Sequence, residues 1–406
     1  MTANLKYYHI LFFLLFTASI FFRFKIAFEL PLGVSTNEYG LKGFDDEPAH
    51  LNYTMFIIQN NTLPKFTTDV TSPDAFQKNE FEYHQPPLYY LLIFSLSKLF
   101  AVDSLNQVLL IGRVTNILLS LLGMVLVYLI LKKLYFSDIK ILTALSIYLL
   151  LGSSVYQQTV FSNDTLSWIF IWSLLFLVLD SVLQNWQKIV IILTLAQLTK
   201  LNIFPFYFLL LAVFYLELKN QKILKLTVIR LTAILLVPFI LLTPWYLRNL
   251  NEYGSIFLLN LFDYEWHFVK SIGESILKLL RMPYSFLFRM HFEPAKEILT
   301  YLNILPNIWL LSSAILTLVK MRQIFKATSQ LQTINLLLMV YSVAYLYYAI
   351  PTGYTEGRFL YPALPAILYF MTEILFIEKI KNRFVEGWQM LITAIVFLPS
   401  FIFGFF

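Results

Sequence analysis

Long apolar runs dominate this chain and restrict it to a small set of folds. A helix needs about 20 apolar residues to cross about 30 Å of hydrocarbon, and runs near this length recur throughout the sequence. Charged residues make up 13% of the chain and hydrophobic residues 58%, whereas soluble domains carry about 25% charged residues. A water-soluble globule is therefore excluded, and we predict an all-α polytopic membrane protein. The expected spans are 7–28, 112–131, 139–159, 164–184, 188–199, 203–217, 226–246, 301–319, 333–350, 359–377 and 388–406.

Three simple observations exclude several other classes of protein. The chain contains no cysteine, which excludes a disulfide scaffold, a thiolate metal site and a cysteine nucleophile. Its charges are sparse and its net charge is only +6, which argues against disorder and against nucleic-acid binding. The first apolar run, Tyr7–Phe22, has no small-residue cleavage site, so we predict a retained span and not a cleaved signal peptide.

The segment 87–101 decides which way the later spans face. It follows a Pro-Pro pair and carries Lys98 near its end, which suits a helix lying at the membrane interface. If it does not cross and the N-terminus is cytoplasmic, the short inner loops hold fourteen Lys and Arg residues, but if it crosses they hold four. Cytoplasmic loops are enriched in Lys and Arg. We therefore predict a juxtamembrane helix here and about eleven transmembrane helices, with the pair around Lys200 forming either one broken helix or two short ones.

The predicted topology places two long loops with juxtamembrane helices on the outer face, at 29–111 and 247–300. The inner loops are short and basic, so we expect any chemistry on the outer face. The second outer loop begins near Arg248 and is rich in aromatic and charged residues. We expect amphipathic helices that form a roof over a cavity, although interfacial anchoring explains each of these residues equally well.

Consecutive carboxylates open the first outer loop. Asp45, Asp46 and Glu47 precede Pro48 just beyond a span, where charge is costly unless it is solvated or functional. One interpretation is a helix cap, because helix starts favour Asp at the N-cap and Pro in the first turn. The other is a general base, or a carboxylate that activates an acceptor, at the membrane surface.

Two histidines in the same loop raise the question of a metal. His50 and His84, together with the carboxylates of Asp46, Glu47 and Asp164, offer enough ligand atoms for a divalent ion. Their spacing carries no metal-binding signature. The sequence therefore predicts no certain cofactor and leaves a divalent metal open.

Three cations are expected on the outer face. Arg113 and Arg358 each lie at the outer start of a span, and Lys200 interrupts an apolar run. Snorkelling to the interface is a sufficient explanation for each of them alone. Their occurrence at one membrane surface favours the binding of an anionic lipid headgroup, especially a phosphate. Asp164 also begins a span, where helix capping is a sufficient explanation.

This ordered set of motifs resembles the GT-C class of lipid-carrier-dependent glycosyltransferases. It is similar in particular to bacterial relatives of the protein O-mannosyltransferases and of the aminoarabinose transferase that acts on lipid A, in glycosyltransferase family 39. The resemblance runs from about residue 40 to 370. It is carried by Asp46-Glu47 with His50, His84-Gln85-Pro86-Pro87-Leu88-Tyr89-Tyr90, Arg113, Asn163-Asp164, Thr199-Lys200, Pro244-Trp245-Tyr246-Leu247-Arg248-Asn249, and Gly357-Arg358-Phe359 with Pro362 and Pro365.

The resemblance implies a GT-C fold and roles for the carboxylates. Asp46 would be the catalytic base or the carboxylate that positions the acceptor, with Glu47 in support. Asp164 would be a second carboxylate near the site.

The resemblance also implies roles for the cations and for neighbouring side chains. Arg113, Lys200 and Arg358 would hold the phosphate of a polyprenyl-phosphate donor. The remaining candidates for lining the site are His50, His84, Gln85, Arg248, Tyr354 and Glu356.

The implied function is that of a membrane glycosyltransferase. It would move a sugar from a polyprenyl-phosphate donor to a lipid, glycan or protein acceptor, with inversion at the anomeric carbon. The resemblance implies a multi-pass protein of a bacterial inner membrane, with its active face towards the periplasm. Many family members carry a soluble outer domain after the last span, whereas this chain stops at Phe406 within an apolar run. We therefore expect a single transmembrane domain over 1–406, and the acceptor stays open.

Two other functions remain as alternatives. A transporter or flippase for a lipid-linked sugar would use the same outer cations without a base. Against it, Asp180 and Glu373 lie towards the inner ends of their expected spans and form no midplane relay. The second alternative is a non-catalytic subunit with the GT-C shape.

Overall fold

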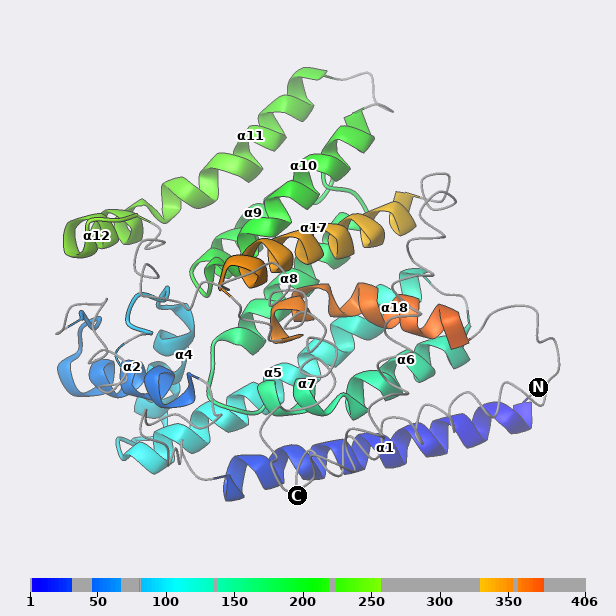
Figure 1. Ribbon diagram of the computed structural model, residues 1–406, viewed down its shortest axis with the longest axis horizontal. Helices are drawn as coiled ribbons and strands as arrows, with labels where there is room; N and C mark the ends of the chain where they lie inside the picture. Colours follow the sequence, from blue (N-terminus) through cyan, green and yellow to red (C-terminus); the bar gives the residue numbers. More distant parts are fainter. Residues whose placement is uncertain are drawn as a thin grey trace. The chain divides into compact units, whose positions relative to one another are not determined.

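The computed structural model describes residues 2–30, 46–66, 80, 82–134, 137–218, 224–256, 329–352 and 357–375. Every regular element in these ranges is a helix (Figure 1). The described part of the chain therefore agrees with the predicted all-α architecture.

Among the described residues, two helices are long and apolar enough to cross a membrane. They are α1 (Thr2–Glu29), whose candidate span begins at Tyr7, and α5 (Leu105–Leu134). The number rises to three if Thr227–Leu241 and Thr243–Tyr253, which meet at a bend of 47°, form one broken span. These helices support the prediction of a membrane protein.

Most of the other expected spans appear as helices. The predicted number of about eleven stays a prediction, because the expected spans 301–319 and 388–406 lie outside the described residues. The helices found are α6 (Asp138–Leu150), α7 (Gly152–Gln157), α8 (Asp164–Val178), α9 (Trp186–Gln197), α10 (Phe204–Leu218), α11 (Leu224–Leu241), α17 (Ser329–Thr352) and α18 (Leu364–Leu375).

The apolar run around Lys200 forms two short helices. α9 ends at Gln197, and Lys200 has an extended backbone with φ −163° and ψ 144°. The 3₁₀ turn η1 (Leu201–Ile203) then leads directly into α10. The sequence allowed one broken helix or two short ones here, and the structure contains two short helices with an extended residue between them.

The predicted first outer loop contributes α2 (Glu47–Asn60) and α4 (Leu88–Leu99), which pack against each other. α2 ends where Asn61 adopts a left-handed conformation, with φ 52°, which is a common way to terminate a helix. Residues of both helices share a buried core that includes Tyr53 and Tyr90. α4 has 12 residues, and the juxtamembrane position expected for 87–101 stays a prediction.

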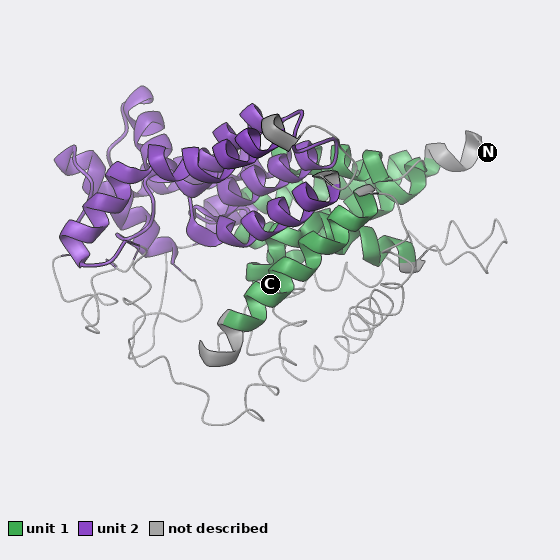
Figure 2. Ribbon diagram, turned by 90° about the horizontal axis from the view of Figure 1, so that it is seen from above, with its two compact units in different colours: residues 1–24, 122–157, 271–406 green, residues 25–121, 158–270 purple. Residues whose placement is uncertain are grey.

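The chain divides into two compact units, each built from separated parts of the sequence (Figure 2). Unit 1 comprises 1–24, 122–157 and 271–406, and unit 2 comprises 25–121 and 158–270. Within unit 1, α6 packs against α18, and the 3₁₀ helix η3 (Gly357–Ala363) packs against α7 and α17. Within unit 2, α9 packs against α8 and α11. The single domain expected over 1–406 stays a prediction.

Candidate active site

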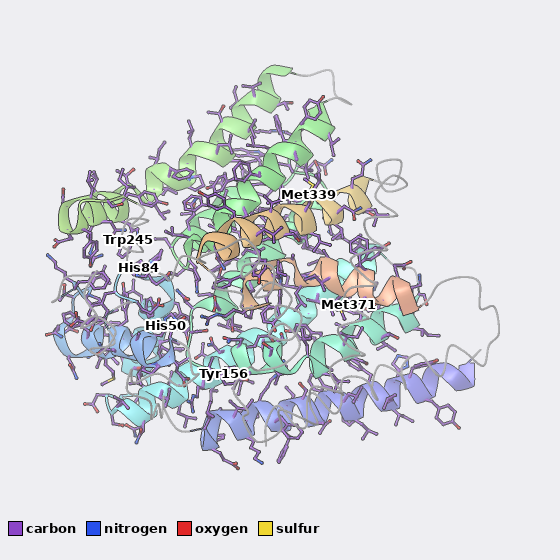
Figure 3. All side chains as sticks on the ribbon, in the orientation of Figure 1. His50, His84, Tyr156, Trp245, Met339 and Met371 are labelled. Atoms are coloured by element: carbon purple, nitrogen blue, oxygen red, sulfur yellow. The ribbon has the colours of Figure 1, made fainter. Side chains whose placement is uncertain are left out.

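Charged side chains from four segments of unit 2 come together, although they lie far apart in the sequence. Asp46 and His50 belong to the start of α2, where Figure 3 labels His50. Glu82 comes from the turn before α4, Asp164 begins α8, and Lys200 lies in the break after α9. The charges of Asp46, Asp164 and Lys200 act on both His50 and Glu82. We call these five residues the charged cluster.

Asp46 occupies the N-cap position of α2. Its side chain makes no capping hydrogen bond, and Pro48 lies in the first turn. The backbone carbonyl of Asp46 accepts the N–H of His50 at 2.9 Å. Side chains four residues apart lie on one face of a helix, so the half-buried Asp46 carboxylate and the buried His50 ring face the same side.

Glu47 forms a buried ion pair with Arg113. Arg113 Nε donates to Glu47 Oε1 at 2.9 Å, and Arg113 Nη2 donates to Glu47 Oε2 at 2.6 Å. Both side chains are 1% exposed. A bidentate pair of this kind has fixed geometry as well as charge complementarity, so it joins the first turn of α2 to α5.

The third nitrogen of Arg113 is also bound within the protein. Its Nη1 donates to the carbonyls of Leu30 at 2.6 Å and Ala27 at 3.2 Å, at the end of α1. Glu47 Oε1 accepts a further hydrogen bond from the backbone N–H of Phe161 at 2.7 Å. All three guanidinium nitrogens of Arg113 are therefore bound within the protein, and its expected contact with a donor phosphate stays a prediction.

Gly112 allows Phe161 to reach this ion pair. A Cβ atom at position 112 would overlap the ring of Phe161, which is fully buried and packs edge-on against Tyr89 at 5.6 Å between ring centroids. Glu47 accepts its hydrogen bond from the backbone N–H of Phe161. A shift of the Phe161 ring would therefore also move this N–H.

We expect Gly112→Ala to destabilise the protein by about 1–3 kcal/mol, the usual cost of inserting a methyl group into a packed core. Thermal unfolding of the detergent-solubilised protein measures this loss. Gly254→Ala is the comparison, because it has open space around the position and its cost of about 1–2 kcal/mol comes from the left-handed φ of 69° alone. An unchanged unfolding temperature for Gly112→Ala would contradict the close approach of Phe161.

Asp164 and Lys200 form the second ion pair of the site. Lys200 Nζ donates to Asp164 Oδ1 at 2.8 Å, and both side chains are largely buried. Two polar contacts hold their segments together. Asn163 Nδ2 donates to the carbonyl of Thr199 at 3.1 Å, and Ser167 Oγ donates to Asn202 Oδ1 at 2.6 Å. The extended residue Lys200 is thereby aligned with the first turn of α8.

A stack of aromatic rings holds His50 in place. Its Nδ1 is hydrogen-bonded to the hydroxyl of Tyr90 at 2.7 Å. The Tyr90 ring stacks on Tyr53 with 3.7 Å between centroids and 7° between planes. All three side chains are buried, so the imidazole has a fixed orientation.

Glu82 is positioned by a hydrogen-bonded turn that is attached to α2. The N–H of Gln85 donates to the carbonyl of Glu82 at 2.9 Å. Asn52 Nδ2 donates to the Tyr83 hydroxyl at 2.8 Å, and the Tyr53 hydroxyl donates to the Gln85 carbonyl at 3.3 Å. Glu82 Oε2 approaches His50 Nδ1 at 3.8 Å.

Burial has opposite effects on these two neighbours. It raises the pKa of the Glu82 carboxyl and lowers the pKa of the His50 imidazole, because both ionised forms lose solvation. The charge of each partner opposes this effect on the other. The site therefore holds an acidic and a basic group close together without bringing them into hydrogen-bond contact.

The remaining candidates have other placements. His84 and Gln85 are half-buried in the turn before α4. Arg248 packs over the rings of Trp245 and Tyr253 and donates to the carbonyl of Pro64, so it attaches α12 (Thr243–Tyr253) to the chain after α2.

Three predicted site residues, Tyr354, Glu356 and Arg358, precede the last described helix in the sequence. Arg358 belongs to η3 in unit 1, where it is buried and packs over the ring of Phe359 at 5.5 Å. Its part in donor binding stays a prediction. Tyr354 and Glu356 lie outside the described residues.

Glu82, Tyr90 and the backbone of Phe161 were not among the site residues predicted from the sequence. Glu82 lies only two residues before His84, so its place in the loop was a usable signal. The burial of Glu82 could not be predicted, because it depends on how the turn packs against α2.

The fold is similar to that of solved glycosyltransferases. The oligosaccharyltransferase of Archaeoglobus fulgidus, in its apo form, aligns with a TM-score of 0.58 and 11% identity over 97% of this chain and 55% of its own. ArnT from Cupriavidus metallidurans, bound to undecaprenyl phosphate, aligns with a TM-score of 0.54 and 14% identity over 94% of this chain and 63% of its own. Both are GT-C enzymes, so the GT-C-like fold of lipid-carrier-dependent glycosyltransferases, predicted from the sequence, is confirmed.

A further structure extends this comparison. The oligosaccharyltransferase AglB of Archaeoglobus fulgidus, in complex with an inhibitory peptide and a dolichol-phosphate, aligns with a TM-score of 0.54 and 13% identity over 97% of this chain. The chain spans between 55% and 63% of the length of the chains in these three structures. The sequence itself matches no protein-family model and no curated protein.

Proposed function

We propose that this protein is a membrane glycosyltransferase that moves a sugar from a polyprenyl-phosphate donor to an acceptor on the periplasmic face of a bacterial inner membrane. The observation that carries the proposal is the charged cluster, which brings the half-buried carboxylate of Asp46 and the cation of Lys200 into one site. The GT-C-like fold supports the transferase class. A lipid-linked donor is supported by the undecaprenyl phosphate of the ArnT structure and the dolichol-phosphate of the AglB structure.

The proposed reaction is a single displacement at the anomeric carbon of the donor sugar. The acceptor hydroxyl or amine attacks this carbon, and its proton passes to the Asp46 carboxylate. The bond between the anomeric carbon and the phosphate oxygen breaks, and polyprenyl phosphate leaves with the electron pair. Attack from the face opposite the leaving group inverts the anomeric centre.

Cations near the leaving group stabilise the charge that grows on the departing phosphate. Lys200 takes this role in our proposal, with Asp164 holding its ammonium group in place through the 2.8 Å contact. Arg113 is assigned the positioning of Glu47, because its three guanidinium nitrogens are bound to Glu47 and to the end of α1.

We expect Lys200→Met to raise the donor KM about tenfold or more, since a hydrogen bond to a charged group contributes about 1.5–3 kcal/mol. Initial rates against donor concentration measure the change. Lys65→Met is the control, because Lys65 is largely exposed and pairs with Glu252. An unchanged donor KM would remove the substituted residue from the phosphate site.

The function itself is tested with purified protein in liposomes. The probes are radiolabelled sugars linked to undecaprenyl phosphate, and a membrane envelope extract supplies the acceptor. The expected result is labelled product together with an equal amount of released undecaprenyl phosphate. If the donors stay intact and instead cross the bilayer, the protein is a transporter and the proposal fails.

A further inference from the structure

A fully buried amide in α5 holds a stretch of backbone that has no regular structure. Asn116 Nδ2 donates to the carbonyl of Val160 and, at 3.0 Å, to the carbonyl of Ser162. Both carbonyls belong to the segment 160–163, which is buried, precedes α8 and is not helical. Buried carbonyls outside helices and strands need another kind of partner, and the amide of Asn116 supplies one hydrogen for each. Asn116 therefore fixes the path of this segment.

Both supports of Lys200 come from the residues that directly follow this segment's Ser162. Asn163 Nδ2 donates to the carbonyl of Thr199 at 3.1 Å, which holds the backbone just before Lys200. Asp164 Oδ1 accepts from Lys200 Nζ at 2.8 Å, which holds the ammonium group. Asn163 and Asp164 are the two residues after Ser162, so a shift in the backbone of Ser162 would move both supports together.

The other end of the segment depends less on the buried amide. Phe161 N–H donates to Glu47 Oε1 at 2.7 Å, but Glu47 also accepts two hydrogen bonds from Arg113. If the segment moved, Glu47 would keep this bidentate ion pair, and its neighbour Asp46 would stay in place. Loss of the amide of Asn116 should therefore affect Lys200 more than Asp46.

We propose that Asn116 is a positioning residue for Lys200, and that it acts through the segment 160–163. The inference deepens the proposed function and rests on it for one point, the binding of the donor phosphate by Lys200. Asn116 orients the lysine through the backbone of the segment and is not itself a catalytic residue. An ammonium group held in one orientation binds a phosphate without first losing its conformational freedom.

The first test is Asn116→Leu, which keeps the size of the side chain and removes its hydrogen bonds. We expect the donor KM to rise about three- to tenfold, the scale of losing a hydrogen bond between neutral groups, and kcat to change less, because Asp46 stays in place. In the double variant with Lys200→Met, the donor KM should equal that of Lys200→Met alone. Two residues that act through one interaction give non-additive effects of this kind, which a general loss of packing does not.

Thr143→Val is the matched control. It also replaces a fully buried polar side chain by an apolar one of similar size, but Thr143 donates to the carbonyl of Ile139 within its own helix, α6 in unit 1. Its donor KM should equal that of the wild type. Asn116→Ser is a milder second variant for the case that Asn116→Leu does not fold, because the smaller side chain leaves room for a water that can donate to the carbonyls. Its donor KM should lie between those of the wild type and Lys200→Met.

A second measurement needs no sugar transfer. The purified protein is treated briefly with an amine-reactive acetylating reagent, and the labelling of each lysine is followed by mass spectrometry. In the wild type, Lys200 is 16% exposed and paired with Asp164, so it should react slowly. In Asn116→Leu or Asn116→Ser it should react several times faster, because the ion pair opens more often. Lys65, which is 59% exposed, is the internal reference and should react equally in all variants.

An unchanged donor KM and unchanged Lys200 labelling in folded, monodisperse Asn116 variants would overturn the positioning role. So would effects that multiply in the double variant, or an equal rise of the donor KM in Thr143→Val. The transferase proposal is judged separately. Faster labelling of Lys200 in the Asn116 variants, without donor consumption by the wild type, would support the positioning role and contradict the transferase. Donor consumption by the wild type, with an unchanged donor KM in the Asn116 variants, would support the transferase and overturn the positioning role.

Discussion

Asp46→Asn is expected to lower the rate of sugar transfer by about 10²- to 10⁴-fold, the range typical for loss of a general base. The amide has nearly the size and shape of the carboxylate, so the fold should be kept. It cannot accept the proton of the acceptor, because its oxygen is a far weaker base. The loss should appear in kcat, whereas the donor KM should change little, since Lys200 and not Asp46 is proposed to bind the donor phosphate.

The matched control for this variant is Asp103→Asn. Asp103 belongs to the same predicted outer loop but is exposed, two residues before α5, and its substitution should leave turnover unchanged. Both variants are compared as monodisperse protein with equal unfolding temperatures. Turnover near the wild-type rate in Asp46→Asn would contradict the assignment of Asp46 as the base.

The positions of Asp46, Asp164 and Lys200 in one site could be predicted from the sequence. Asp164 and Lys200 lie at the ends of apolar runs and Asp46 lies in the loop after the first one, and the distribution of Lys and Arg predicts that all three are on one membrane face. Side chains at the same membrane face and at the same depth in the bilayer are expected to lie close together. The pattern of span ends therefore contains most of the information needed to bring Asp164 and Lys200 together.

The choice of partners could not be predicted in the same way. Arg113 lies at the expected outer surface, as a phosphate ligand would, but in the structure it pairs with Glu47, 66 residues away. A cation at the end of a span can bind a lipid phosphate or a protein carboxylate with the same chemistry. Only the packing of α1, α2 and α5 distinguishes these two outcomes, and sequence pattern carries no measure of that packing.

Glu82 illustrates a second limit of the sequence. Its neighbours Glu80 and His84 have the same polar character, yet Glu80 is buried like Glu82 whereas His84 is only half-buried, and no periodicity marks this difference. The hydrogen bonds from Asn52 and Tyr53 to the turn decide this, and they join segments about 30 residues apart. The composition of the site could thus be predicted more fully than its hydrogen-bond geometry.

Arg113→Ala is expected to destabilise the protein by about 3–5 kcal/mol, the usual cost of leaving one member of a buried ion pair without its partner. Glu47 would retain only the Phe161 N–H, and the carbonyls of Ala27 and Leu30 would lose their donor. Lys65→Ala is the control, because it breaks an ion pair whose lysine is 59% exposed, and exposed pairs contribute at most about 1 kcal/mol. Thermal unfolding and the yield of monodisperse protein measure the difference.

The double variant Glu47→Gln with Arg113→Met separates the ion pair from the rest of the site. Removing both charges leaves no buried charge without a partner, so the double variant should be more stable than Arg113→Ala, although the α1 carbonyls still lack a donor. The donor KM distinguishes the two roles considered for Arg113. If Arg113→Ala unfolds at the same temperature as Lys65→Ala but shows a raised donor KM, Arg113 binds the phosphate, as the family resemblance implies. If stability falls and the folded fraction keeps its donor KM, Arg113 acts by fixing Glu47 next to Asp46.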